Sequence, residues 1–223
     1  MSKSGLFKSS IGRKVAMALS ALFLMVFLLQ HLVINITAII SPDTFNELSH
    51  FMGTNPLVQF LAQPILIFAV VFHFVMGFYL ELKNRAARPI SYNKFNGSAN
   101  SSWMSRNMTI SGLVILAFLA LHFVDFWFPE MNYKYIQMNP ADPTRYYEEL
   151  LHKFANPARV IAYVVAFILL SLHLLHGFGS AFQSMGQNNK YIDGLKKFGV
   201  FYSIAVPLGF ILIAITLYVT TLN

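Results

Sequence analysis

Five of the seven histidines in this chain lie inside long apolar stretches of sequence, where an ionisable side chain is costly. They are His31, His73, His122, His173 and His176. A single histidine in such a place can be satisfied by a hydrogen bond to a neighbouring helix. At least one histidine on each of four consecutive stretches favours a shared role, and imidazole is a common metal ligand. These histidines therefore form the candidate functional site.

The stretches that would position the histidines are long enough to cross a bilayer as helices, which takes roughly 20 apolar residues. They span about residues 15–40, 57–82, 108–128, 158–182 and 198–220. The chain is 56% hydrophobic and only 11% charged, which excludes an ordinary soluble domain. We therefore expect residues 1–223 to form a single all-α integral membrane domain of five transmembrane helices. Helices one to four would form a four-helix bundle that carries the histidines, and the fifth would only pack against it.

The chain contains no cysteine. Disulfides, a cysteine-ligated iron–sulfur cluster and a covalently attached c-type haem are therefore excluded. The first apolar stretch is too long for the core of a signal peptide, and no small-residue cleavage site follows it. Any redox centre in this chain must be held by other ligands, among which histidine is the obvious candidate.

The direction of successive helices sorts four of the histidines into two levels. Helices one and three run the same way, and His31 and His122 lie past their midpoints, roughly 5–6 Å to one side of the bilayer centre. Helices two and four run back, which places His73 and His173 roughly 4–5 Å to the other side. Two histidines that face each other across a bundle can ligate one haem iron from both sides. The pattern predicts two b-type haems that carry electrons across the membrane.

The basic residues are distributed unevenly among the segments that connect the helices. Of the 16 lysines and arginines, 12 lie before helix one, between helices two and three, or between helices four and five. The positive-inside rule makes that side cytoplasmic, with the N-terminus inside and the C-terminus outside. The basic side would bind anionic lipid, or would in addition dock a soluble cytoplasmic partner. Nucleic acid is not expected as a partner.

A repeated pattern supports the inner pair: His73 and His173 each begin a His-x-x-x-Gly sequence, which ends at Gly77 and Gly177. Residues four apart share a helix face, so each glycine would remove a side chain that collides with a flat macrocycle beside the ligand. Close packing of helices is the alternative reason for these glycines. His176, three residues after His173, is the alternative inner ligand, although His173 matches the depth of His73 better.

Other polar residues lie near these ligands. Gln30, Asn35 and Asp125 could orient a ligand's second nitrogen, line a quinone pocket or make ordinary interhelical hydrogen bonds. Trp103 and Arg106 precede helix three on the predicted cytoplasmic side. They could bind propionates of the inner haem, or they could be an interfacial aromatic residue and a topology charge.

Two helix starts share one capping signal, with Asn at the N-cap and Pro at the first helical position. The pairs are Asn55-Pro56 and Asn156-Pro157. Pro64 and Pro207 lie inside the second and fifth predicted helices, where we expect kinks that pack against neighbouring helices.

The chain resembles the single-subunit, dihaem cytochrome b that anchors succinate:quinone oxidoreductases and fumarate reductases in the membrane, most of all the form found in Bacteroidetes. The resemblance covers nearly the whole chain. It includes five helices, histidines on the first four, both His-x-x-x-Gly patterns and the segment Asn100-Ser-Ser-Trp-Met-Ser-Arg-Asn107. It implies that His31 and His122 hold an outer haem b, that His73 and His173 hold an inner haem b, and that the quinone is menaquinone.

The resemblance also implies a bacterial inner membrane and two cytoplasmic partners, a flavoprotein with covalent FAD and an iron–sulfur subunit. Succinate and fumarate would interconvert on the flavoprotein, so this chain would be the quinone-reactive subunit of respiratory complex II and would supply no catalytic residue for the carbon chemistry. Some relatives have a carboxylate near the outer quinone site, for which Glu47 is the candidate. Some have a basic residue after helix four that holds a propionate, where this chain has Gln183-Ser184.

Two other classes of membrane protein remain as alternatives. One is the cytochrome b subunit of another membrane oxidoreductase, of the hydrogenase, formate dehydrogenase or cytochrome b561 type, although those families pair and space their histidines differently. The other is a transporter or structural membrane protein without haem, whose histidines serve protonation or packing. A haem spectrum would separate the last class from the first two.

Overall fold

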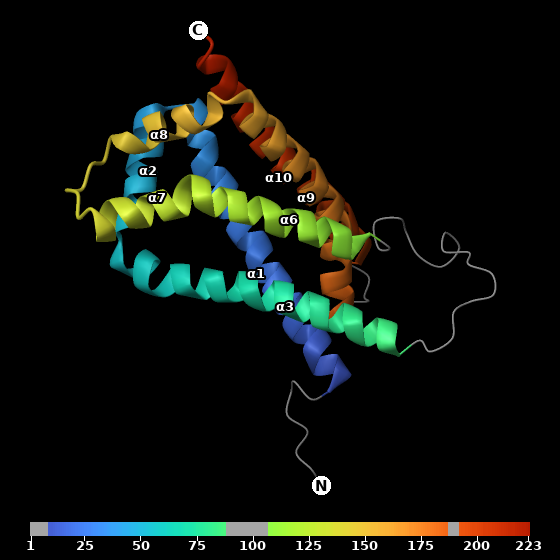
Figure 1. Ribbon diagram of the computed structural model, residues 1–223. Helices are drawn as coiled ribbons and strands as arrows, with labels where there is room; N and C mark the ends of the chain where they lie inside the picture. The colour runs from blue at the N-terminus through green and yellow to red at the C-terminus, as the bar shows by residue number, and fades with distance from the viewer. Residues whose placement is uncertain (1–8, 88–106, 187–191) are drawn as a thin grey trace.

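The computed structural model describes residues 9–87, 107–186 and 192–223, and these residues fold into helices without any strand (Figure 1). The main helices are α1 (Ser10–Ile36), α3 (Gln63–Ala86), α6 (Met108–His122), α9 (Pro157–Ser184) and α10 (Ile192–Thr220). With their helical extensions, five segments are long and apolar enough to cross a membrane: Ser10–Ile39, Val58–Ala86, Met108–Ile136, Pro157–Ser184 and Ile192–Thr220. The five predicted transmembrane helices are thus confirmed.

The helix ends differ from the expected ones wherever polar residues continue a helix beyond its apolar stretch. α1 begins at Ser10 rather than near residue 15, because the Ser9 side chain caps it by accepting a hydrogen bond from the Gly12 N–H at 2.9 Å. The third span continues past residue 128 to Ile136. It does so through the π-helical segments η4 (Phe123–Trp127) and η5 (Asn132–Ile136), which the short helix α7 (Phe128–Met131) joins.

Two further helices at one end of the molecule were not expected from the sequence: α2 (Pro42–Thr54), which the turn η2 (Thr37–Ile39) connects to α1, and α8 (Arg145–Phe154). They contact each other, and the backbone N–H of Tyr147 donates to Asn46 Oδ1 at 2.8 Å. Both mix polar and apolar residues, so a search for long apolar stretches does not detect them. We call this end the C-side, because α10 ends there, and the end at which α1 starts the N-side (Figure 1).

Both Asn-Pro pairs start a helix, as predicted. Asn156 Oδ1 accepts a hydrogen bond from the Ala158 N–H at 2.9 Å at the start of α9. Asn55 Oδ1 accepts from the Leu57 N–H at 2.9 Å where the second span begins.

The two internal prolines have different surroundings. The π-helical segment η3 (Val58–Ala62) ends two residues before Pro64, which has no N–H to donate to the preceding turn. A π-helical turn is one of the ways in which a helix accommodates an interrupted hydrogen-bond ladder. Pro207 lies inside α10 and is fully buried against the neighbouring helices.

Helices α1, α3, α6 and α9 form the four corners of a bundle. α1 contacts α3 and α9, while α6 contacts α9 and, less extensively, α3. α1 therefore lies diagonally opposite α6, and α3 lies diagonally opposite α9. α10 lies outside this square, where it packs against α9 and α1, and Figure 1 shows it running alongside α9. The four histidine-bearing helices thus surround a common centre, and the fifth helix covers one flank.

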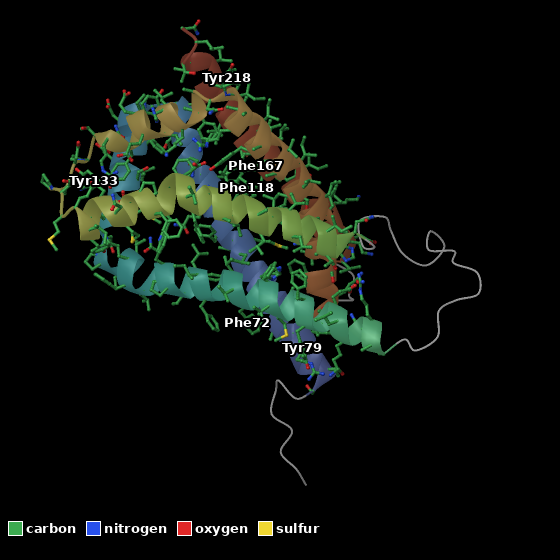
Figure 2. All side chains as sticks on the ribbon, in the orientation of Figure 1. Phe72, Tyr79, Phe118, Tyr133, Phe167 and Tyr218 are labelled. Atoms are coloured by element: carbon green, nitrogen blue, oxygen red, sulfur yellow. The ribbon has the colours of Figure 1, made fainter. Side chains whose placement is uncertain are left out.

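Packing density is uneven across the molecule. α10 and α9 share a core that includes Phe210, Leu217 and Phe167, and the Tyr202 hydroxyl of α10 donates to the Met25 carbonyl of α1 at 2.5 Å. Figure 2 shows Phe118 and Phe167 close together in the interior, with ring centroids 5.5 Å apart. In contrast, α3 has a single buried residue, Ala69. The histidine-free helix is therefore well packed, whereas α3 and α6, which has no buried residue, are the least packed of the five main helices.

Candidate functional site

The outer histidines, His31 on α1 and His122 on α6, meet across the bundle. Their ring centroids are 5.8 Å apart and the ring planes are at 89°. Metal–imidazole bonds are about 2 Å long, so two imidazoles on opposite sides of one ion have ring centres roughly 6 Å apart. The spacing of His31 and His122 therefore fits two axial ligands of one iron.

Aromatic side chains enclose this outer pair. The two imidazoles lie within 5.1–5.8 Å, between ring centroids, of Phe27, Phe210, Phe118 and Phe126. Such a wall excludes water and offers flat apolar surface to a macrocycle. Both properties suit a buried haem.

The Nδ1 atoms of His31 and His122 have few hydrogen-bond acceptors near them. The Asn35 side-chain amide donates to the His31 carbonyl at 2.8 Å, and its Nδ2 lies 3.3 Å from His31 Nδ1. Of the roles considered for Asn35, the structure therefore favours a contact with the second ring nitrogen of His31. His122 Nδ1 is buried and has no hydrogen-bond partner in the described part of the chain.

The inner histidines, His73 on α3 and His173 on α9, are each held by a serine of a neighbouring helix. Ser20 Oγ of α1 lies 3.1 Å from His73 Nδ1. Ser111 Oγ of α6 lies 3.1 Å from His173 Nδ1. Ser20 lies eleven residues before His31 on α1, a rise of roughly 16 Å, so His73 is at a separate level nearer the N-side.

A cavity of about 280 Å³ lies between α1, α3, α6 and α9 at this inner level. His73 and Gly177 line it. Toward the N-side its wall includes Lys14, Ser180 and Ser184. The cavity therefore combines an imidazole, a glycine that leaves space, and a cation with two hydroxyls at the end where carboxylates of a cofactor could be held.

The two glycines of the His-x-x-x-Gly patterns face neighbouring helices. A methyl group added at Gly77 would lie 3.4 Å from Met17 Cε of α1, and one added at Gly177 would lie 3.7 Å from Met108 Cε of α6. These are ordinary van der Waals contacts, so helix packing alone would tolerate alanine at Gly177. The position of Gly177 in the cavity wall is the feature that favours the role predicted for it beside a macrocycle.

His176 is placed differently from His173. It is half-buried on α9, and the described residues give it no hydrogen bond, whereas His173 has Ser111. His173 lies within electrostatic reach of both His73 and His176. Ser111 thus holds Nδ1 of His173, whereas no described residue hydrogen-bonds a ring nitrogen of His176.

Four other predicted site residues have different outcomes. Trp103 and Arg106 lie outside the described residues. Glu47 is exposed on α2 and does not line a cavity described here. Gln30 is exposed on α1 and makes no hydrogen bond with the described residues.

Asp125 is buried in the π-helical segment η4, three residues after His122. The Tyr163 hydroxyl donates to its Oδ2 at 2.9 Å, and Arg159 Nε lies 3.1 Å from the same oxygen. Of the roles considered for Asp125, the structure therefore supports an interhelical hydrogen bond between the third span and α9.

A polar cluster that was not predicted lies at the C-side. Glu130 pairs with both Lys134 and Arg145, and Arg145 Nη1 donates to Glu149 at 2.7 Å. Burial lowers the pKa of Arg145, but its hydrogen bonds to these carboxylates outweigh that effect and raise the pKa above its usual range. Burial, followed by the charge of Glu130, raises the pKa of Tyr146 to about 12, so its phenol stays protonated at neutral pH.

The cluster borders a cavity of about 220 Å³ at the C-side. Side chains from α2, from η3 at the start of the second span, from the end of the third span and from α8 line it, among them His50, Gln59, Tyr133, Lys134 and Arg145. His50 Nδ1 is buried and has no hydrogen-bond partner among the described residues. The cavity thus offers an unused imidazole nitrogen beside several hydrogen-bond donors.

Comparison with known proteins gives a partial similarity. The chain is 30% identical over 99 residues to the succinate dehydrogenase cytochrome b558 subunit of Bacillus subtilis (strain 168). That match covers 44% of this chain and 45% of the length of that relative. No family model matches the chain. No solved structure matches it either.

Proposed function

We propose that this chain is the membrane-anchor cytochrome b subunit of a succinate:quinone oxidoreductase. It holds two b haems and passes electrons between a soluble iron–sulfur partner and a quinone in the membrane. The observation that carries the proposal is the placement of four histidines on diagonally opposite helices of one bundle, with His31 facing His122 at one level and His73 and His173 each beside a serine at a second level. The similarity to a succinate dehydrogenase cytochrome b subunit supports the choice of partner reaction.

At the inner level, His73 and His173 ligate the iron. The cavity beside His73 has room for part of a macrocycle, and Lys14 at its N-side end would supply a positive charge for the propionates. Ser180 and Ser184 supply hydroxyl groups in the same wall. Some relatives hold a propionate with a basic residue after the fourth helix, where this chain has Ser184. In this chain, Lys14 of α1 would bind the propionate instead.

At the outer level, His31 and His122 ligate the second iron inside the phenylalanine wall. A bound haem supplies a one-electron redox centre at each level. The chain's own residues would supply the imidazoles, keep water away and set the electrostatic surroundings of each iron.

The C-side cavity is the proposed site for the quinone head group. The unpaired His50 Nδ1 can hydrogen-bond a quinone carbonyl oxygen and exchange a proton with it. Glu47, one turn before His50 on α2 and exposed to solvent, is placed to pass protons to the medium. Menaquinone is the proposed quinone.

The N-side is the proposed cytoplasmic side, because the helix ends at that side adjoin, in the sequence, the three segments that hold 12 of the 16 lysines and arginines. The iron–sulfur subunit would dock there, next to the inner level, and a flavoprotein with covalent FAD would carry the succinate site. Electrons would move between that partner and the quinone through the inner level and then the outer level, in a bacterial inner membrane.

The proposal is tested by purifying the chain in mild detergent from its native membrane and recording a reduced-minus-oxidised spectrum. We expect a b-type α band and co-purification of a subunit with covalent flavin. Absence of haem would favour a transporter or structural protein. Two haems without a flavoprotein would favour a cytochrome of the hydrogenase or formate dehydrogenase type.

A further inference from the structure

Helices α1 and α6 carry the same sequence pattern at the same places. Met17-x-x-Ser20 on α1 is followed eleven residues later by His31, and Met108-x-x-Ser111 on α6 is followed eleven residues later by His122. Eleven residues are close to three full helical turns, so the serine and the histidine of each helix share one face. Each of the two helices therefore presents a serine to the inner level and a histidine to the outer level.

The partners of these helices complete the repeat. Ser20 meets His73 of α3, and Ser111 meets His173 of α9, both at 3.1 Å. Met17 lies against Gly77 of α3, four residues after that histidine, and Met108 lies in the same way against Gly177 of α9. The α1–α3 and α6–α9 pairs thus repeat one set of contacts, which the bundle brings together around the inner level.

Counting hydrogens decides the direction of the serine–histidine hydrogen bonds. A serine hydroxyl has one hydrogen, and in each helix it points to a backbone carbonyl three residues earlier. Ser20 Oγ donates to the Met17 carbonyl at 2.8 Å, and Ser111 Oγ donates to the Met108 carbonyl at 2.9 Å. A carbonyl oxygen can only accept. With its hydrogen on that carbonyl, each serine oxygen offers lone pairs to the imidazole, and the tautomer that hydrogen-bonds to it is the one with its hydrogen on Nδ1.

This direction fixes the state of both rings. A neutral imidazole with its hydrogen on Nδ1 has a lone pair on Nε2, which is the form that binds a metal through Nε2. We infer that Ser20 and Ser111 are positioning residues that hold His73 and His173 in the iron-binding tautomer and orientation. The inference rests on the proposed function, because it assigns the serines to the inner haem ligands.

Serine in a membrane helix often bonds the carbonyl of the preceding turn without any further role. Ser171 of α9 gives a matched comparison. It lies two residues before His173, but its hydroxyl donates to the Ser203 carbonyl of α10 at 2.7 Å and not to a histidine. Replacing Ser171 by alanine removes the same group from the same helix and leaves His173 with its serine.

The experiment compares Ser20→Ala and Ser111→Ala with Ser171→Ala, each in the full chain purified with the partners that accompany it. Haem per chain and the midpoint potential of each spectral component are measured. Loss of an outer hydrogen bond to a metal-ligating histidine typically weakens metal affinity 10- to 100-fold. Where haem is retained, a less basic imidazole favours ferrous iron. A tenfold shift of the equilibrium between ferric and ferrous iron toward the ferrous form raises the midpoint potential of the inner haem by about 59 mV.

We expect each serine variant to lose the inner haem or raise its potential while the outer component is unchanged, and Ser171→Ala to behave as wild type. A threonine and valine pair at each position controls for folding, because only threonine keeps the hydroxyl in a side chain of the same shape. Threonine should restore the inner component, and valine should not.

Three results overturn the inference. In the first, the alanine and valine variants keep both haems with an unchanged inner potential. In the second, Ser171→Ala shifts the inner component as much as Ser20→Ala does. Either result leaves two haems in the wild-type chain, so the proposed function would stand without the serine role. In the third, the wild-type chain contains no haem, and both proposals fail together.

Discussion

The two histidine levels of this bundle are constructed in different ways. At the inner level, Nδ1 of each ring lies 3.1 Å from a serine hydroxyl on a neighbouring helix, and His73 lies beside a cavity that is bordered by a lysine. At the outer level, phenylalanine rings enclose the imidazoles, and His122 Nδ1 has no partner in the described part of the chain. Hydrogen bonds to serines orient both inner rings, whereas aromatic rings surround the outer pair, in which His31 alone has a polar neighbour at Nδ1, Asn35. The inner level should therefore depend on single polar groups, and the outer level on the shape of its wall.

Removing a ligand should give the largest effect and separate the two levels. His73→Ala or His173→Ala should remove the inner haem and spare the outer one, and His31→Ala or His122→Ala should do the reverse. Pyridine haemochrome analysis should show a fall from two haems to one. His152→Ala, in the exposed part of α8, is the control and should keep both. Equal loss of both spectral components from any one ligand variant would contradict the two-level arrangement.

His50→Ala tests whether the C-side cavity serves the outer level. Quinone turnover should fall on the order of tenfold or more, because a group that exchanges protons with the head group is lost. Both haem spectra should stay unchanged, since His50 belongs to neither pair. Steady-state quinone reduction measures the effect, and His152→Ala is again the matched control. Normal turnover in His50→Ala would place the quinone elsewhere.

Gly199→Ala tests the account of α10 as a helix that packs and carries no ligand. An added methyl group would lie 2.4 Å from Phe178 Cδ1 of α9, so the two helices must separate or Phe178 must move. Such overpacking typically costs about 1–3 kcal/mol. We expect a lower melting temperature in detergent with both haem potentials unchanged.

Gly194→Ala, on the same helix with no atom within 4 Å of the added methyl group, should leave the melting temperature as it is. A change in either haem potential in Gly199→Ala would show that α10 contributes to a redox site.

Lys14→Ala should act on the inner level alone and more weakly. Removing a positive charge near the propionates favours ferric iron, so the inner potential should fall, by less than the tenfold equilibrium change of about 59 mV because Lys14 is exposed to solvent. Lys14→Arg keeps the charge and should restore the potential. A redox titration that shows no shift, or a shift of the outer component, would argue against a propionate contact for Lys14.

His176→Ala should have the smallest effect. Because His173 and not His176 is anchored by Ser111, the inner haem should be retained with its spectrum intact. A reduced-minus-oxidised difference spectrum of the purified His176→Ala complex measures whether the inner haem is retained. If His176→Ala lost the inner haem and His173→Ala kept it, the assignment of the ligand on α9 would be reversed.

Much of this arrangement can be predicted from the sequence, because a bilayer imposes length and polarity rules on each span. The five helices follow from apolar length, and the start of α9 follows from the Asn156-Pro157 pair. The shorter helices α2 and α8 cannot be predicted in the same way, since their amphipathic sequences lack a long apolar stretch. The C-side cavity is missed for the same reason, because those two helices form part of its wall.

The serines show a different kind of limit. A serine in an apolar helix is unremarkable by itself, and its contact with a histidine of another helix depends on the rotation and register of both helices. The sequence does contain a signal, because Met-x-x-Ser precedes a histidine by the same interval on α1 and α6. Only the bundle shows that Ser20 and Ser111 serve the histidines of the neighbouring helices and not those of their own.

The most direct test of the central claim is the number of haems per chain, measured by pyridine haemochrome in the purified wild-type complex with a redox titration of the α band. The two-level bundle predicts two haem b per chain, with two resolved components of which only one responds to Ser20→Ala. A single haem per chain, or none, would contradict it.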